Sequence, residues 1–375
     1  MRMDATSPKR KPDKVRPRTL RALVALVALL SNLLLAAPIA AQGRFLPVRL
    51  PQDAAMHPNA ATEWWYFTGH LRDRSGRTFG FELVTFKLGG LKKLVPLIPF
   101  DTAFRLDMAI SDEHTSTFHS AVRYLLPARG QVAVSPSSLT LRVQSGDTSM
   151  AIATLPGKDL QYRLRGSMTG AALDLTLETA RRPLLEGGSG VVPMGAGGYS
   201  YYYSLTNLQT SGTLRIGTRQ WTVTGLTWMD HQWGNWQWTA IRGWDWMAVQ
   251  LGNGTSLALS NFAASGLVSK SAAVSFPNGT QLVTAALMAP GPQFWTSPAT
   301  KTRYPQAWHI QVPAIGLDAQ VRSTMPNQEM VDPITLGGGY WEGSCTVTGT
   351  LRGKRITGLA YTELVGYGAR GAAGF

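Results

Sequence analysis

Six of the 12 tryptophans of this chain fall within the 19 residues from Trp228 to Trp246, and the same segment holds Asp230 and His231. A carboxyl group buried among apolar rings has a raised pKa, because burial penalises the charged form. Such a group can donate a proton at neutral pH, and aromatic faces stabilise a positive charge that develops beside them. Adding water to an unactivated double bond requires this combination. We therefore take Asp230 as the candidate acid, His231 as the residue that orients water or relays the proton, and Trp233 as the ring facing the cation.

A structural role for Asp230 stays open, because the second half of the chain has an acid, Glu363, at the corresponding position. An acid in that place could simply end a strand and accept hydrogen bonds from backbone amides. His231 and Trp233 have no such counterpart, which makes them the better functional candidates.

Nine further residues could line a ligand-binding site, with core packing as the alternative for each. Acids beside tryptophans could face a cavity, and an acid at the start of the first aromatic strand could hold indole N–H groups. Consecutive aromatic residues of a strand alternate between the inside and the outside of a barrel. These candidates are Glu63, Trp64, Trp65, Tyr66, Trp244, Asp245, Trp246, Trp341 and Glu342.

The sequence shows no clear pattern for a metal-binding site or for a catalytic nucleophile. The nearest histidine pair, His114 and His119, lacks a third ligand nearby, so we expect no metal site. The lone Cys345 fits a small buried strand residue better than a nucleophile. No Gly-x-Ser-x-Gly elbow occurs, so the sequence shows no nucleophile for a hydrolase, and no phosphate-binding glycine loop occurs either. We expect no cofactor.

The elements that must position these residues are predicted to be strands. Apolar and polar residues alternate in runs such as 79–84 and 173–178, and Asn-Gly pairs at 253–254 and 278–279 are typical of hairpin turns. Beyond residue 41 no helical periodicity extends over twelve residues or more. The sequence therefore predicts an all-β protein, and the length of 375 residues predicts two domains.

An internal repeat supports this division. The segments 203–230 and 340–363 share their order of motifs, with Ser-Gly-Thr-Leu-Arg at 211–215 matched by Thr-Gly-Thr-Leu-Arg at 348–352. Thr-Gly-Leu follows in both, at 224–226 and 357–359. We interpret the chain as a duplicated barrel, with domains at 42–240 and 241–375.

The first 41 residues have the three parts of a secretory signal. Basic residues precede an apolar run from Ala22 to Ala37, and small residues follow at Ala40 and Ala41. We expect a cleaved signal peptide over 1–41 and an exported protein, periplasmic or secreted, that meets a membrane only if the signal is not cleaved. This segment carries +6 of the net charge of +14, and the remainder is too dispersed to indicate nucleic-acid binding.

Three motifs carry a family resemblance: Glu-Trp-Trp-Tyr-Phe-Thr-Gly-His-Leu at 63–71, Trp-Met-Asp-His-Gln-Trp-Gly at 228–234 and Trp-Asp-Trp at 244–246. With them the chain resembles AttH-like proteins, the family that includes carotenoid 1,2-hydratases (hydroxyneurosporene synthases) and a branch described as predicted secreted hydrolases. The resemblance covers about residues 46–367. It implies two lipocalin-like β-barrels packed together, in agreement with the repeat.

The resemblance also bears on function. In the carotenoid hydratases it implies a His-x-Trp pair, matched by His231 and Trp233, working with a Tyr-x-Asp motif about two dozen residues later. That second motif is missing, because residues 257–262 read Leu-Ala-Leu-Ser-Asn-Phe. Fungal pericyclases and isoflavonoid hydratases are further relatives, which implies apolar substrates more generally.

Two functions follow as leading hypotheses, beside a third in which the chain is a structural or surface-interaction protein of the envelope. The first is cofactor-independent hydration or isomerisation of an apolar lipid- or isoprenoid-like small molecule. The second is a non-catalytic carrier of hydrophobic ligands, because lipocalin-like barrels commonly bind without reacting. The oligomeric state is left open by the sequence.

Overall fold

The computed structural model describes residues 46–94, 100–125, 132–134, 140–155, 161–195, 198–332 and 339–368. The expected signal peptide at 1–41 lies outside these ranges. Within them the chain is almost entirely β-structure, and every strand pairing is antiparallel.

The first sheet has 13 strands in the order β4-β3-β2-β1-β13-β12-β9-β8-β7-β6-β5, with β10 and β11 also paired to β12. Its last strand, β13, pairs with its first, β1, so the sheet curls into a nearly closed barrel. The strands are β1 (Thr62–Asp73), β2 (Thr78–Leu88), β3 (Ala103–Asp112), β4 (Thr117–Leu125), β5 (Val132–Val134), β6 (Thr140–Ser145), β7 (Thr148–Thr154), β8 (Gln161–Met168), β9 (Ala171–Glu178), β10 (Leu184–Leu185), β11 (Val191–Pro193), β12 (Tyr199–Ile216) and β13 (Arg219–Asn235).

The second sheet has ten strands in the order β17-β16-β15-β14-β25-β24-β22-β21-β18, with β23 also paired to β24. A separate two-stranded sheet joins β19 (Phe294–Thr296) and β20 (Arg303–Pro305). The ten strands are β14 (Ile241–Leu251), β15 (Ser256–Ala264), β16 (Leu267–Ser275), β17 (Gln281–Ala285), β18 (Leu287–Pro290), β21 (Ala307–Val312), β22 (Leu317–Ser323), β23 (Glu329–Val331), β24 (Gly339–Leu351) and β25 (Lys354–Val365).

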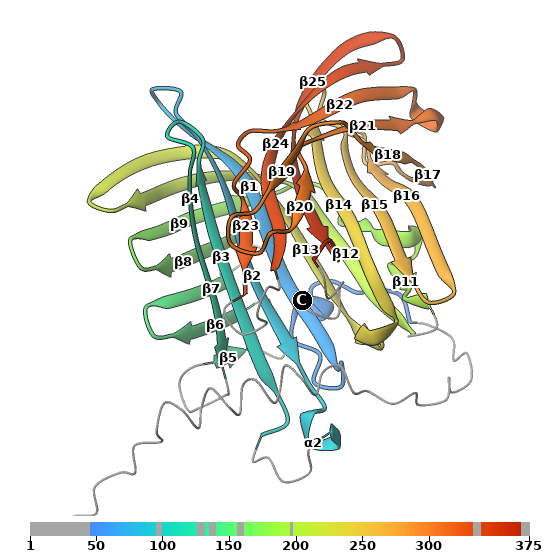
Figure 1. The fold of residues 1–375 in the computed structure, drawn as a ribbon. Coiled ribbons are helices and arrows are strands. Elements are labelled where there is room, and N and C mark those ends of the chain that lie inside the picture. The colour runs from blue at the N-terminus through green and yellow to red at the C-terminus, as the bar shows by residue number, and fades with distance from the viewer. Residues whose placement is uncertain are drawn as a thin grey trace, which may run out of the picture.

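The two sheets repeat one topology. In both, the last strand returns to pair with the first, as β13 does with β1 and β25 with β14. Figure 1 shows the two curved sheets packed against each other, the first at left in blue to green and the second at right in yellow to red. The expected all-β fold of two lipocalin-like barrels is therefore confirmed. The domain limits at 240 and 241 stay a prediction, although β13 ends at Asn235 and β14 begins at Ile241.

Two glycines at equivalent positions of the repeat lie where any side chain would collide with the backbone of the neighbouring strand. A Cβ on Gly225 of β13 would lie 1.9 Å from the carbonyl oxygen of His70, and one on Gly358 of β25 would lie 2.6 Å from that of Gln250. Both glycines stand on the seam that closes their barrel. Because the approaching atoms belong to the backbone and cannot turn aside, only glycine allows the two strands to come so close.

Each barrel is filled by its own apolar core. Side chains of Trp65, Phe67, Leu83, Tyr203 and Trp233, among others, occupy the first barrel. The second is filled in the same way, and its core includes the lone Cys345, as expected for a small buried strand residue. Two smaller apolar clusters lie between the barrels and join them. The two barrels are therefore packed together through apolar side chains as well as being filled by them.

The barrels are also joined by buried polar contacts. The hydroxyl of Tyr66 donates to Glu342 Oε1 over 2.8 Å, and the hydroxyl oxygen of Tyr340 lies within hydrogen-bond distance of Glu82 Oε1 (2.7 Å) and Asp107 Oδ2 (2.8 Å). All five side chains are buried. Such contacts fix the relative position of the barrels, because a displaced carboxyl group would be left buried without a partner.

In the part of the chain that the structure describes, helices are few and short. They are η1 (Gln52–Ala54), α2 (Leu91–Leu94), η2 (Glu186–Gly188), η4 (Trp238–Ala240) and η5 (Pro313–Ile315). None of the helices in the described ranges combines the length and apolar character needed to cross a bilayer.

Candidate functional site

A cavity of about 260 Å³ lies between the two barrels. Strands β1, β2, β11, β12 and β13 of the first barrel and β14, β15, β16, β17 and β25 of the second contribute to its wall, together with η2 and η4. Its lining combines aromatic rings and aliphatic side chains with three carboxyl groups, namely those of Asp230, Glu186 and Glu363.

Asp230 reaches the cavity from β13 and is held by three donors. The hydroxyl of Tyr202 donates to Oδ2 over 2.6 Å, while the hydroxyl of Ser204 and the indole N–H of Trp228 donate to Oδ1 over 2.5 and 2.6 Å. Burial raises the pKa of Asp230 to about 6, against the opposing effect of these hydrogen bonds. The side chain is therefore both fixed in place and able to change its charge near neutral pH.

Glu363 reaches the same cavity from β25 in the second barrel. The indole N–H of Trp244 donates to its Oε2 over 2.8 Å. Burial raises the pKa of Glu363 to about 7, and the nearby charge of Asp230 raises it further against the hydrogen bond from Trp244. The repeat partners Asp230 and Glu363 thus meet in one cavity, each bound to a tryptophan.

A third acid, Glu186, enters from η2. Its Oε1 lies 3.1 Å from the hydroxyl oxygen of Ser204, which also lies 2.5 Å from Asp230 Oδ1, so Ser204 contacts both acids. Burial raises the pKa of Glu186 well above its ordinary value, and the charge of Asp230 adds to this effect. Neighbouring carboxylates in an apolar site cannot all ionise, so this group of acids holds protons at neutral pH.

Aromatic rings form much of the remaining wall. Trp246 lies edge-on to Tyr66, with ring centroids 5.5 Å apart, and Trp64 lies 5.9 Å from Phe86. All four rings line the cavity, as does that of Trp244. The predicted ligand-binding residues Trp64, Tyr66, Trp244 and Trp246 are therefore brought together here.

The structure separates His231 and Trp233 from Asp230, contrary to the expectation that the three act from one site. Side chains alternate along β13, so Asp230 and Gln232 face the cavity while His231 and Trp233 point into the first barrel. There His231 stacks on Trp65, with ring centroids 4.9 Å apart. The proposed roles of His231 in water activation and of Trp233 in cation stabilisation do not fit these positions.

Glu63 also differs from its expected role, because it binds imidazoles and an ammonium group rather than indole N–H groups. Its Oε1 lies 2.8 Å from Nδ1 of His57 and 3.0 Å from Nε2 of His231, and its Oε2 lies 3.4 Å from Nζ of Lys87. Burial opposes ionisation, but the hydrogen bonds with His231 and His57 outweigh it and lower the pKa of Glu63. For His231 burial is the stronger influence: it lowers the pKa, although the hydrogen bond with Glu63 and the charge of Glu63 act to raise it.

The remaining predicted residues lie outside the cavity. Trp65 and Trp341 fill the cores of the first and second barrel, and the indole N–H of Trp341 donates to the carbonyl of Pro326 over 2.8 Å. Asp245 accepts a hydrogen bond from the hydroxyl of Tyr367 over 2.9 Å. Glu342 binds Tyr66 at the contact between the barrels. Their positions match the alternative of structural packing.

Several cavity residues were not singled out from the sequence as site residues. Glu363 appeared there only as the repeat partner of Asp230, although that pairing was the signal that could have identified it. Glu186 and Tyr202 had no motif to mark them. Ser260 and Phe262, which stand where the Tyr-x-Asp motif is missing, do line the cavity. Its carboxyl groups therefore come from β13, β25 and η2 instead of from β15.

Two curated fungal proteins are similar to this chain in sequence. The chain is 28% identical over 214 residues to the dehydratase asqC of Emericella nidulans, and 27% identical over 238 residues to the kievitone hydratase of Fusarium solani subsp. phaseoli. The matches cover 54% and 61% of this chain. They span 60% and 66% of the two relatives, which is less than two thirds of their length.

Solved structures support the fold. The crystal structure of an AttH protein from Nitrosomonas europaea superposes with a TM-score of 0.73 at 25% identity, covering 89% of this chain and all of that one. Kievitone hydratase from Nectria haematococca gives a TM-score of 0.68 at 20% identity, covering 85% of this chain and 93% of that one. At this low identity the similarity shows a shared fold and nothing more. The AttH-like sequence pattern itself matches residues 40–367. The expected resemblance is thus confirmed, and the chain belongs to the AttH-like family.

Proposed function

We propose that this protein adds water to, or eliminates water from, an apolar small molecule bound between its barrels. One observation carries the proposal: two buried carboxyl groups with raised pKa, Asp230 and Glu363, come from different barrels and face one cavity lined by tryptophans. The names of the two curated relatives, a dehydratase and a hydratase, support the same class of reaction.

The hydrogen bonds indicate which carboxyl group plays which part. Asp230 accepts hydrogen bonds from three donors, and donors to a carboxylate favour its charged form. Glu363 accepts one hydrogen bond, from Trp244, and has the higher pKa of the two. We therefore assign the acid to Glu363 and the base to Asp230. This moves the role of acid away from Asp230, the candidate from the sequence.

In the direction of hydration, the carboxyl group of Glu363 transfers its proton to one carbon of the double bond, and the other carbon becomes cationic. The oxygen of a water molecule bonds to that carbon, and the carboxylate of Asp230 takes the proton that the water loses. Return of a proton from Asp230 to Glu363 through solvent restores the starting state. Dehydration follows the same steps in reverse.

The wall of the cavity suits a cationic intermediate. The rings of Trp64, Trp244 and Trp246 line it, and aromatic faces stabilise a cation by about 2 kcal/mol when water is excluded. Tyr202, whose hydroxyl is fixed on Asp230, and Gln232, whose amide donates to Ser200 over 2.7 Å, place polar groups where water must bind.

The same apolar wall supports binding without reaction, which makes a carrier of hydrophobic ligands the second candidate. We further propose that the protein works after export, in the periplasm or outside the cell. The order of basic, apolar and small residues over 1–41 supports this location.

The experiment is to purify the protein from its native host, extract it with organic solvent and identify any bound molecule by mass spectrometry. Wild type is compared with Glu363→Gln and with Asp318→Asn, a matched carboxyl-to-amide change at an exposed site on β22. Catalysis predicts that the molecule from Glu363→Gln differs by one water from that of wild type and of Asp318→Asn. An identical apolar molecule in all three proteins would identify a carrier and contradict the reaction.

A further inference from the structure

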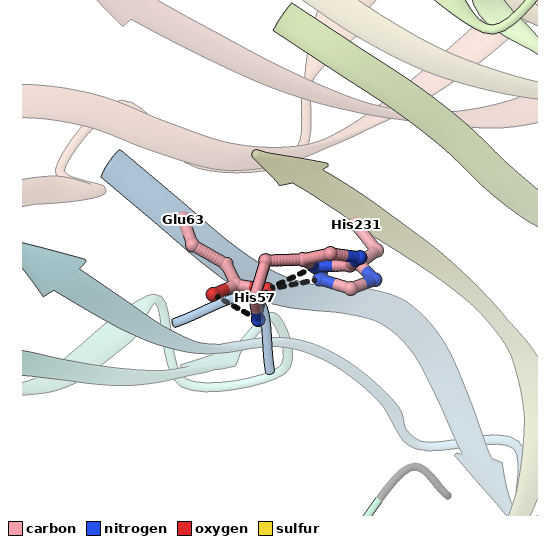
Figure 2. Close-up of side chains that lie close together, drawn as sticks. All are labelled: His57, Glu63 and His231. Atoms are coloured by element: carbon pink, nitrogen blue, oxygen red, sulfur yellow. Dashed lines mark hydrogen bonds and ion pairs between the residues drawn. The ribbon is translucent and has the colours of Figure 1, made fainter. Parts of the chain in front are cut away.

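Three potential metal ligands converge inside the first barrel, on the opposite face of β13 from the cavity. They are Nδ1 of His57, Nε2 of His231 and one carboxylate oxygen of Glu63, all within 4.8 Å of one another. Figure 2 shows Glu63 arriving from β1, His231 from β13 and His57 from the segment that precedes β1. No pair of histidines close in sequence forms this group, so the spacing along the chain gave no sign of it.

We propose that His57, Glu63 and His231 bind one divalent transition-metal ion, for which Zn²⁺ is the best-fitting candidate. Two imidazole nitrogens with one carboxylate oxygen are a ligand set that Zn²⁺ uses in proteins, with water in the fourth position. Imidazole ligands favour zinc over the oxygen-seeking cations Mg²⁺ and Ca²⁺.

Two of the three separations between the ligand atoms are close to those of a zinc site. Tetrahedral ligands about 2.0–2.1 Å from zinc are roughly 3.3 Å from one another. Here Glu63 Oε1 lies 2.8 Å from Nδ1 of His57 and 3.0 Å from Nε2 of His231. The ligand atoms of the two imidazoles lie within 4.8 Å of each other, so a metal ion would draw the three side chains around it.

The two imidazoles have neighbours of the kind that orient histidines in metal sites. A histidine that binds a metal commonly donates its other ring N–H to a carboxylate or a backbone carbonyl. Nε2 of His57 lies 3.5 Å from Oδ1 of Asp53, and the ring of His231 makes a hydrogen bond with the backbone of the same Asp53. One residue of η1 therefore supports both imidazoles.

The rings and the carboxylate are fixed from their other sides as well. His57 stacks on Trp233, with centroids 4.1 Å apart and planes 4° from parallel. The backbone N–H of His57 lies 3.0 Å from both oxygens of Glu63, and Nζ of Lys87 lies 3.4 Å from Oε2. His57 and Asp53 remain 23% and 28% exposed, which gives an ion a route from solvent.

The place of the cluster indicates what the metal does. His57 belongs to the segment before β1, whereas Glu63 and His231 lie on the paired strands β1 and β13. An ion bound by all three would fasten that segment to the seam of the first barrel. The ion would lie on the opposite face of β13 from the cavity proposed for the reaction.

The test uses protein without a histidine tag, stripped with a chelator and dialysed with Zn²⁺, followed by elemental analysis and calorimetric titration. Wild type is expected to hold one zinc per chain. His57→Ala and Glu63→Gln are each expected to weaken zinc binding at least tenfold. His309→Ala is the matched control, because Nε2 of His309 lies 2.8 Å from Asp318 with no third ligand assigned, and it should bind zinc as wild type does.

A second measurement distinguishes a bound metal ion from a cluster that is held by hydrogen bonds alone. Cobalt in place of zinc should give the visible absorption of a four-coordinate ion in wild type but not in His57→Ala. His57→Ala leaves the contacts of Glu63 with His231 and Lys87 in place, so it remains informative if Glu63→Gln does not fold. Folded wild type that takes up no zinc, or equal zinc uptake by wild type and His57→Ala, would overturn the proposal.

Discussion

Asp230 and His231 are neighbours in sequence, yet their side chains lie on opposite faces of β13. Asp230 lines the cavity between the barrels, and His231 is enclosed in the first barrel beside Glu63. One strand thus serves two sites of different chemistry. The cavity has raised carboxyl pKa values and aromatic walls, whereas the barrel interior has an ionised carboxylate between two imidazoles.

The first prediction concerns the pH dependence of the reaction. The active form needs a protonated Glu363 and an ionised Asp230, whose pKa values are about 7 and about 6. The rate should therefore fall as pH rises above about 7, because Glu363 loses its proton, and fall as pH drops below about 6, because Asp230 gains one. The pH profile of kcat/KM measures both limbs. A rate that keeps rising above pH 8 would contradict the assignment of the acid.

The second prediction concerns the indole N–H that Trp244 donates to Glu363. This hydrogen bond favours the charged form of Glu363, so Trp244→Phe should raise its pKa further. We expect the alkaline limb of the pH profile to move to higher pH in Trp244→Phe while the acidic limb stays in place. A role in packing alone would lower the rate without moving either limb.

The third prediction concerns the ring of Trp246. Removing an aromatic face that stabilises a cation by about 2 kcal/mol corresponds to about a 30-fold loss of rate. Trp246→Leu should therefore lower kcat by about that factor, and Trp246→Phe should lower it much less because a face remains. Trp295→Leu, on β19 and away from the cavity lining, is the control. Equal losses in Trp246→Leu and Trp246→Phe would show that the ring does not meet a cation.

The fourth prediction concerns stability and Glu342. Burial, together with the charges of Glu82 and Glu363, raises the pKa of Glu342 well above its ordinary value of 4.5. The folded protein keeps this proton while the unfolded chain loses it above about pH 4.5, so the group destabilises the fold as pH rises. Glu342→Gln keeps an oxygen for Tyr66 to donate to and removes the titration.

Chemical denaturation at pH 4.5 and pH 8 measures the effect. Relative to wild type, Glu342→Gln should gain in free energy of unfolding between pH 4.5 and pH 8. The exposed Glu178→Gln, at the end of β9, should show no such gain. A difference between Glu342→Gln and wild type that does not change with pH would contradict a raised pKa at Glu342.

Much of the fold could be predicted because it rests on local patterns. The repeat of Thr-Gly-Leu at 224–226 and 357–359 predicted a duplicated barrel, and in the structure both glycines lie on the strand pair that closes a barrel, where a Cβ would collide with the neighbouring backbone. The alternation of Trp64, Trp65 and Tyr66 was also predicted, although not which of them point inward. In the structure Trp65 lies inside the barrel, and Trp64 and Tyr66 face the cavity.

The composition of the site could be predicted only in part, for a physical reason. Both faces of β13 are buried, one inside the barrel and one between the barrels, so alternation yields two sets of residues without telling which set faces the ligand. His231 was therefore assigned to the wrong face. His57 lies outside any strand, and Glu186 in a short 3₁₀ turn, where no periodicity reports on position.

The most direct test of the central claim is conversion of the bound molecule in labelled water. The molecule extracted from Glu363→Gln is incubated with fresh wild-type, Asp318→Asn or Glu363→Gln protein in H₂¹⁸O and analysed by mass spectrometry. We expect wild type and Asp318→Asn to add one ¹⁸O-labelled water to this molecule or to remove one water from it, and Glu363→Gln to do so about 10²–10⁴-fold more slowly. A molecule that wild type leaves unchanged, or that Glu363→Gln converts at the wild-type rate, would contradict the proposed reaction.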